Sequence, residues 1–150
     1  MNYDAAIIGA GPAGMAAATL LAEHGARVLL LDEQAAPGGQ IYRSIEDSSP
    51  AKLRVMGSDY ARGVSLTQRL RASSAEYLPD SAVWNITPGR DIYFSRHGQS
   101  RRITAETIIL ATGAMERPMA VPGWTLPGVM SVGALQIMLK SSAVISQGVM

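Results

Sequence analysis

The stretch AAIIGAGPAGMAAATLLAEHGARVLLLDEQAAPGGQ, residues 5–40, decides the fold of this 150-residue chain. Its first eighteen residues carry no charge, but their apolar content is mostly Ala and Gly, which gain little from lipid. A secretion signal needs a basic start, whereas this chain begins Met-Asn-Tyr-Asp. We therefore expect neither a membrane span nor a signal peptide, and interpret the run as a phosphate-binding turn.

Three glycines of this stretch, Gly9, Gly11 and Gly14, have the spacing G-x-G-x-x-G. Residues 3–8 predict a buried strand before them, and residues 15–24 predict a helix after them. In a βαβ unit the first glycine permits the tight turn, the second lets the backbone approach a pyrophosphate, and the third lets the helix pack close to the sheet. The positive end of that helix faces the phosphates.

An acidic residue completes the pattern. Residues 28–31 predict a second buried strand, and Asp32 follows it, eighteen residues beyond Gly14. A βαβ unit places an acid here to hydrogen-bond a ribose hydroxyl, and the neighbouring Glu33 is the alternative. This order of elements predicts dinucleotide binding and disfavours a helix–strand pair that packs for stability alone.

The amino-acid composition limits which classes of protein and which kinds of partner fit this chain. The chain is 47% hydrophobic and 17% charged, as expected of a soluble globular protein. Its net charge of +1, with no basic run among aromatics, predicts no nucleic-acid partner. The absence of cysteine excludes disulfides and thiolate metal sites and fits a reducing, cytoplasmic location. Because His24 and His97 are isolated, we predict no metal site, and no catalytic acid, base or nucleophile is recognisable.

The rest of the chain shows the patterns of helices, strands and connecting loops. Residues 50–74 have helical character, and residues 79–105 predict a β-meander with Gly-containing turns. A buried strand is predicted over residues 107–111, where it brings backbone close to the nucleotide at its carboxyl end. Residues 115–127 predict an ordered crossing loop, and Ser131 caps a predicted helix that extends to residue 139.

The βαβ unit alone does not separate FAD from NAD. Three segments, GAGPAGMAAA, LLLDEQAAPGGQIYR and LATGAMERPMAVPGWTLPGVMSVGALQIMLK, resemble the FAD-binding N-terminal part of the pyridine nucleotide-disulfide oxidoreductase superfamily. The second and third are most similar to flavoprotein subunits of opine oxidase, hydrogen cyanide synthase and proline or hydroxyproline dehydrogenase. The resemblance implies an α/β fold, with a Rossmann-like FAD-binding domain of parallel sheet plus small β-meander over residues 1–114. Residues 115–150 would be a crossing loop and helix leading toward a second dinucleotide-binding domain absent from this chain.

The resemblance also implies the FAD contacts. Facing the pyrophosphate would be Gly9, Gly11, Pro12, Ala13 and Gly14. The adenosine ribose would be held by Asp32 or Glu33. Beside the ribose, ribityl or flavin portion would lie Gly39 and Gln40, together with Tyr42 and Arg43. The backbone of Val83 would contact the adenine. Against the cofactor where the chain leaves the FAD domain would lie Ala111, Thr112 and Gly113.

The implied function is that of an FAD-dependent oxidoreductase whose parent protein oxidises amino acids or opine-like amines, in a homo- or hetero-oligomer. NAD(P)H would be bound by a segment absent from this chain. The chain departs from disulfide-reductase relatives because it has no cysteine pair, so its own residues cannot reduce disulfides. Two rival hypotheses are an NAD(P)-dependent dehydrogenase domain and a truncated, non-catalytic nucleotide-binding or structural module.

The chain is further expected to be part of a working flavoprotein. Residues 148–150 would begin the second glycine-rich unit, and the 150 residues alone would bind FAD weakly and associate through the apolar face of residues 132–139.

Overall fold

The computed structural model describes residues 2–145. The chain divides into two compact units, residues 1–113 and residues 114–150, which are described separately below. The predicted start of a second glycine-rich unit, at residues 148–150, lies outside the described residues.

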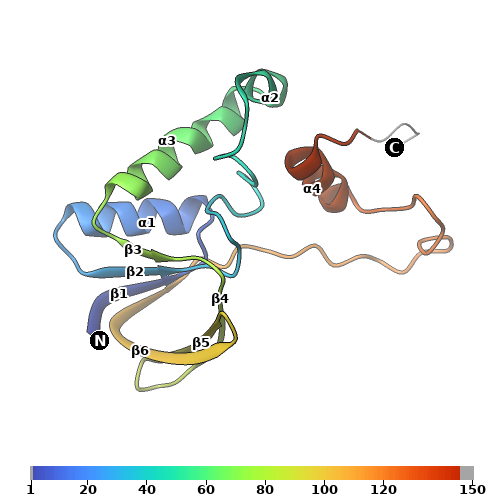
Figure 1. Ribbon diagram of the computed structural model, residues 1–150. Coiled ribbons are helices and arrows are strands. Elements are labelled where there is room, and N and C mark those ends of the chain that lie inside the picture. Colours follow the sequence, from blue (N-terminus) through green and yellow to red (C-terminus); the bar gives the residue numbers. More distant parts are fainter. Residues whose placement is uncertain (1, 146–150) are drawn as a thin grey trace. The chain divides into compact units, whose positions relative to one another are not determined.

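The first unit is built on a six-stranded sheet of order β3-β2-β1-β6-β5-β4 (Figure 1). Strands β3, β2, β1 and β6 are parallel, whereas β5 and β4 pair antiparallel. The strands are β1 Asn2–Ile8, β2 Val28–Leu31, β3 Glu76–Leu78, β4 Ser81–Ile86, β5 Asp91–Arg96 and β6 Gln99–Leu110. This arrangement confirms the predicted α/β class, a parallel sheet with a small β-meander.

Strand β6 joins the two parts of the sheet. Its first residues pair with β5, and its later residues pair parallel with β1, from Asn2↔Thr104 to Ile8↔Leu110. The last strand of the predicted meander and the strand predicted at residues 107–111 are therefore one strand. The prediction that this second segment is buried is wrong, because Thr107 and Leu110 are exposed. The three-residue strand β3 was not predicted, because so short a segment carries no detectable period.

Three helices, α1 Pro12–Glu23, α2 Pro50–Met56 and α3 Ser58–Ala72, belong to the same unit. Helix α1 begins three residues earlier than predicted, because the fixed φ of Pro12 suits the first helical position. The helical segment predicted over residues 50–74 is two helices, since Gly57 adopts a φ of +87° that a continuing helix does not allow.

Residues 5–8 of β1 and all of β2 are buried on both faces of the sheet, which explains their uncharged, apolar sequence. Helices α1 and α3 lie on one side of β1–β3, and β4 and β5 curl away on the other (Figure 1). Neighbouring residues of β1 accordingly enter different clusters. Ile7 packs with Met15 of α1 and Leu70 of α3, whereas Ile8 packs with Phe94 of β5.

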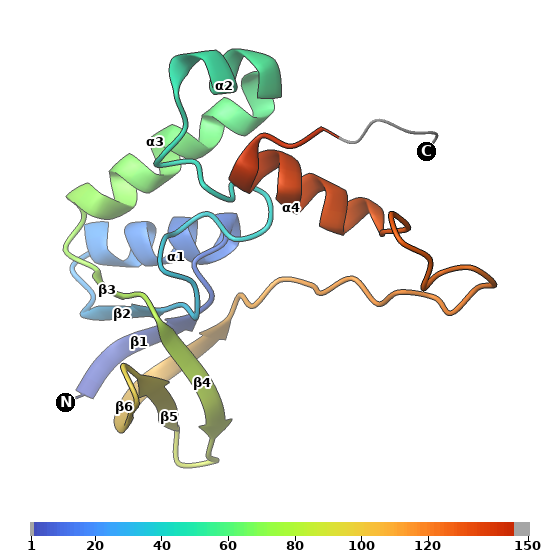
Figure 2. The same cartoon turned by 45° about the vertical axis from the view of Figure 1, so that its right-hand side comes forward.

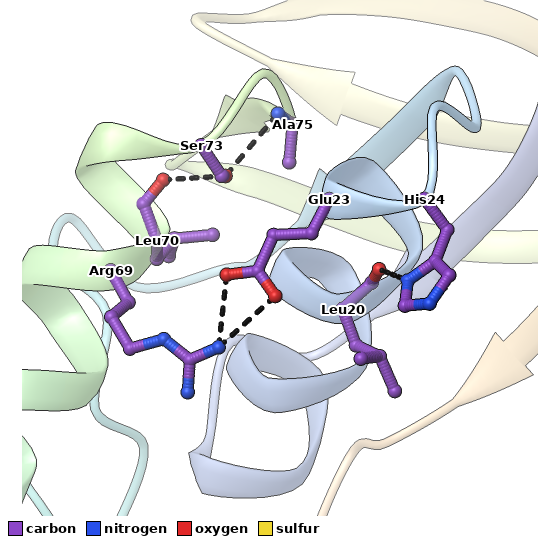
Figure 3. A network of polar contacts seen from close by, with 7 residues as sticks. All are labelled: Leu20, Glu23, His24, Arg69, Leu70, Ser73 and Ala75. Atoms are coloured by element: carbon purple, nitrogen blue, oxygen red, sulfur yellow. Dashed lines mark hydrogen bonds and ion pairs between the residues drawn. The ribbon is translucent and has the colours of Figure 1, made fainter.

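One ion pair joins α1 to α3, and further hydrogen bonds close the carboxyl end of each helix (Figure 3). The Nη2 atom of Arg69 lies 2.9 and 3.1 Å from the two carboxylate oxygens of Glu23. His24 Nδ1 lies 2.8 Å from the carbonyl oxygen of Leu20, and Ser73 Oγ donates to the Leu70 carbonyl over the same distance. Because the ion pair is about half exposed, it contributes at most about 1 kcal/mol, and apolar packing dominates this contact.

The second unit contains α4, Val132–Ser142, at the position of the predicted C-terminal helix. Ser131 caps it as predicted, accepting a hydrogen bond of 3.3 Å from the Ala134 amide. The Glu116 carboxylate accepts from the Gly133 amide at 2.9 Å and from the Ser131 hydroxyl. Within residues 2–145, no helix has both the length and the apolarity needed to cross a membrane.

Tyr3 provides a stability test. Its hydroxyl donates a 2.7 Å hydrogen bond to Glu76, linking β1 to β3. Burial, followed by this bond, raises the pKa of Tyr3 from 10.0 to about 12. Tyr3→Phe should lower the free energy of unfolding by about 1 kcal/mol at neutral pH in urea titrations.

The contribution of Tyr3 is fully present below pH 10 and is lost as the pH rises through about 12, because only the folded state holds the proton more tightly. The wild type should therefore lose more stability than Tyr3→Phe between these two values. Parallel pH curves for the two proteins would contradict this role.

Candidate dinucleotide site

The turn between β1 and α1 is packed against the end of β6. Gly9 has a φ of +103°, and a Cβ there would collide with the carbonyl of Ala111. A Cβ on Gly14 would collide with the carbonyl oxygen of Gly9. The Ala111 amide donates to the Ile8 carbonyl at 2.8 Å and so holds β6 in this position. The fold itself therefore requires the first and third glycines of the motif.

Gly11, the middle glycine, is different. Its φ of −71° and ψ of −179° suit any residue, and no atom lies within 4 Å of a Cβ built on it. Gly11 is also the N-cap of α1, where no side chain caps the first-turn amides. Protein packing therefore does not explain this glycine.

The loop after β2 folds onto this turn. The Gly38 amide donates to the Ala10 carbonyl at 2.8 Å. Gly39 has a φ of +59°, and a Cβ on it would lie 2.9 Å from the Cα of Gly11. The predicted segment at Gly39 and Gln40 thus follows directly on the contact with the glycine turn. A residue larger than glycine at position 39 would not allow the backbone to come this close.

Asp32 is buried at the end of β2 and is fixed on several sides. Its Oδ2 accepts from the Ala10 amide at 2.7 Å, and its Oδ1 accepts from the Gln34 amide at 3.0 Å. Its own backbone bonds to Leu78 and Ser81 at 3.2 and 2.7 Å. Asp32 therefore braces the glycine turn, a role that sequence spacing did not reveal, and each carboxylate oxygen retains capacity to accept a ribose hydroxyl.

The alternative acid, Glu33, is exposed, and its carboxylate accepts a 3.3 Å hydrogen bond from the side chain of the adjacent Gln34. Asp32, in contrast, bonds directly to the backbone of the glycine turn. The geometry consequently favours Asp32 over Glu33 as the acid held beside the turn.

Val83 and Thr112 line one shallow hollow with Trp84 and Leu110 on the meander side of the sheet. Strand β4 is an edge strand of the sheet (Figure 2), and a bulge interrupts its pairing with β5 between Val83 and Asn85. The outer backbone edge at Val83 is therefore unpaired by any strand in residues 2–145. Gly113 adopts a φ of +72° in open space at the end of the first unit.

Tyr42 and Arg43 point to different partners. The ring of Tyr42 packs on Gly63 of α3, where a Cβ would lie 2.6 Å from it, and its centroid lies 6.4 Å from that of Tyr60. The Arg43 guanidinium instead donates to the side chains of Gln34 and Gln40, at 3.5 and 3.3 Å.

No group of three or more His, Cys, Asp or Glu residues that could hold a metal ion occurs in the part of the chain that the structure describes. His24 belongs to the C-terminal end of α1, as described above, rather than to the glycine turn.

This fold and site place the chain in a known class. Residues 3–146 match the family described as pyridine nucleotide-disulphide oxidoreductase, and the chain belongs to that family. The resemblance of the three sequence segments to the pyridine nucleotide-disulfide oxidoreductase superfamily is thereby confirmed.

Particular relatives sharpen the assignment. The chain is 48% identical to one of the subunits of opine oxidase from Rhizobium meliloti (strain 1021), over 97% of this chain and 32% of the relative. It is 35% identical to the HcnB subunit of hydrogen cyanide synthase from Pseudomonas protegens, over 96% of this chain and 31% of the relative. The chain thus spans about a third of the length of these curated relatives.

The crystal structure of L-proline dehydrogenase from P. horikoshii superposes with a TM-score of 0.76, at 23% identity, over 96% of this chain and 29% of that chain. Thioredoxin reductase from Streptococcus pyogenes aligns with a TM-score of 0.56 at 31% identity, over 81% of this chain and 39% of that one. The first likeness shows the fold.

Proposed function

We propose that this chain is the FAD-binding part of an FAD-dependent oxidoreductase that oxidises the C–N bond of amino acids or opine-like amines. The observation that carries the dinucleotide assignment is Gly11, which faces open space at an uncapped helix end. Membership of the pyridine nucleotide-disulphide oxidoreductase family supports FAD as that dinucleotide. A bound diphosphate accounts for a glycine there, and neither the backbone conformation nor the packing does.

The residues present fit FAD. The first-turn amides of Ala13 and Gly14 would receive the diphosphate, since Pro12 has no N–H to donate. Asp32 would accept from the adenosine ribose while it braces the turn. The edge backbone at Val83 would contact the adenine, and the segment 111–113 would lie along the cofactor.

When bound, the flavin supplies the acceptor for the hydride or electrons that the amine loses. The residues described above hold and orient the cofactor. None of them is assigned as a catalytic acid or base.

The names of two relatives, opine oxidase and hydrogen cyanide synthase, support the proposed substrate class. Since both relatives are named as subunits, we also propose that the protein works in an assembly. NAD(P)H use through a segment absent from this chain is part of the same proposal.

The substrate proposal is tested by anaerobic mixing of opines and amino acids with the FAD-loaded chain and with any longer product of the same gene. A longer product should lose its visible flavin absorbance when an amine is added and regain it with an artificial electron acceptor. Bleaching by NADH with none by any amine would contradict amine oxidation, while leaving flavin binding intact.

A further inference from the structure

Arg43 has unused hydrogen-bonding capacity beside the site. Its Nε atom is shielded from solvent and has no hydrogen-bond partner, one of two such buried side-chain atoms in residues 2–145, with the Tyr77 hydroxyl. Its Nη atoms reach only the neutral side-chain oxygens of Gln34 and Gln40, over 3.5 and 3.3 Å. Both bonds are long for a charged donor, which prefers about 2.7–2.9 Å.

Arg43 also lacks a counter-charge. Three other arginines of the first unit form ion pairs with carboxylates, namely Arg62 with Asp59, Arg69 with Glu23 and Arg71 with Glu46. None of the ion pairs within the described part of the chain includes Arg43. A partly buried cation without an anion is unfavourable, so this guanidinium is suited to an anion that arrives with a ligand.

The contacts of Arg43 indicate which part of the ligand would supply this anion. Gln34 follows the proposed ribose ligand Asp32 by two residues and donates its amide to it. Gln40 follows Gly39, whose backbone lies against Gly11. The two contacts of the guanidinium therefore tie it to the loop after β2, at one residue that bonds to Asp32 and at another that follows Gly39.

We propose that Arg43 binds the diphosphate of the dinucleotide directly, exchanging its weak amide contacts for phosphate oxygens. The planar guanidinium of arginine can donate to two phosphate oxygens at once. It also supplies a positive charge, which the backbone amides of the helix do not have. This inference rests on the proposed dinucleotide function and adds a side-chain ligand to it.

The test compares ADP with adenosine, which differ by the diphosphate, by NMR titration of the 150-residue chain. Arg43→Gln should weaken ADP binding about ten- to a hundredfold and leave adenosine binding unchanged. Arg43→Lys should recover part of the loss, because it restores the charge without the planar guanidinium. Arg62→Gln is the matched control, since it removes one exposed arginine of α3 and should change the binding of neither ligand.

Equal weakening of ADP and adenosine by Arg43→Gln would overturn the inference and make Arg43 a brace of the loop. Unchanged ADP binding would overturn it as well. A wild type that binds neither ADP nor FAD would refute the dinucleotide function itself, an outcome distinct from either result with the variant.

Discussion

Gly11→Val is expected to fold like the wild type and to bind FAD more than a hundredfold more weakly. The backbone angles of Gly11 suit valine, and no protein atom opposes a Cβ there. The added side chain would occupy the space proposed for the diphosphate and would separate it from the first-turn amides. Losing two charge-assisted hydrogen bonds, at about 1.5–3 kcal/mol each, gives this magnitude. Flavin titration and urea denaturation of the same sample measure both quantities.

Gly14→Ala is the matched variant with the opposite expectation. Its Cβ would meet the Gly9 carbonyl oxygen, a backbone atom of a tight turn that cannot move aside. We expect the free energy of unfolding to fall by about 3 kcal/mol, at the upper end of the usual effect of overpacking. If Gly11→Val were instead as unstable as Gly14→Ala, the open space at Gly11 would serve folding rather than a ligand.

Asp32→Ala should reduce FAD affinity about ten- to a hundredfold and also destabilise the protein by roughly 2–4 kcal/mol. The affinity loss reflects a charge-assisted hydrogen bond to ribose. The stability loss follows because the amides of Ala10 and Gln34 would each lose their acceptor. The losses of affinity and of stability come from the same carboxylate. Urea denaturation without FAD measures the stability loss alone, so that the affinity loss can be judged separately.

Glu33→Ala provides the control, because Glu33 is exposed and its carboxylate bonds to Gln34. It should leave affinity and stability close to wild type. Normal affinity in Asp32→Ala with a loss in Glu33→Ala would move the ribose contact to Glu33. If neither variant weakened binding, the ribose assignment would fail.

Periodic and spaced features were predictable from the sequence. The glycine spacing, the apolar strands and the acid after the second strand follow local rules, and the structure contains the predicted strand at Val28–Leu31 and the cap at Ser131. The family also followed from the sequence, because three separated segments pointed to one cofactor class and the match extends over residues 3–146.

Features that depend on contacts between distant residues were not predictable. No local pattern indicates that Asp32 bonds to Ala10, that the ring of Tyr42 packs on Gly63, or that Gly39 lies against Gly11. The continuity of β6 was missed for a similar reason, since its two halves have different pairing partners and therefore different patterns.

Binding of FAD at the open glycine turn is open to a direct test. The most direct measurement is equilibrium dialysis of the purified chain against equal concentrations of FAD and NAD, followed by denaturation of the protein and identification of the nucleotide that was enriched with it. We expect a yellow chromophore identified as FAD, strongly reduced in Gly11→Val. Release of NAD alone, with no affinity for FAD, would contradict it.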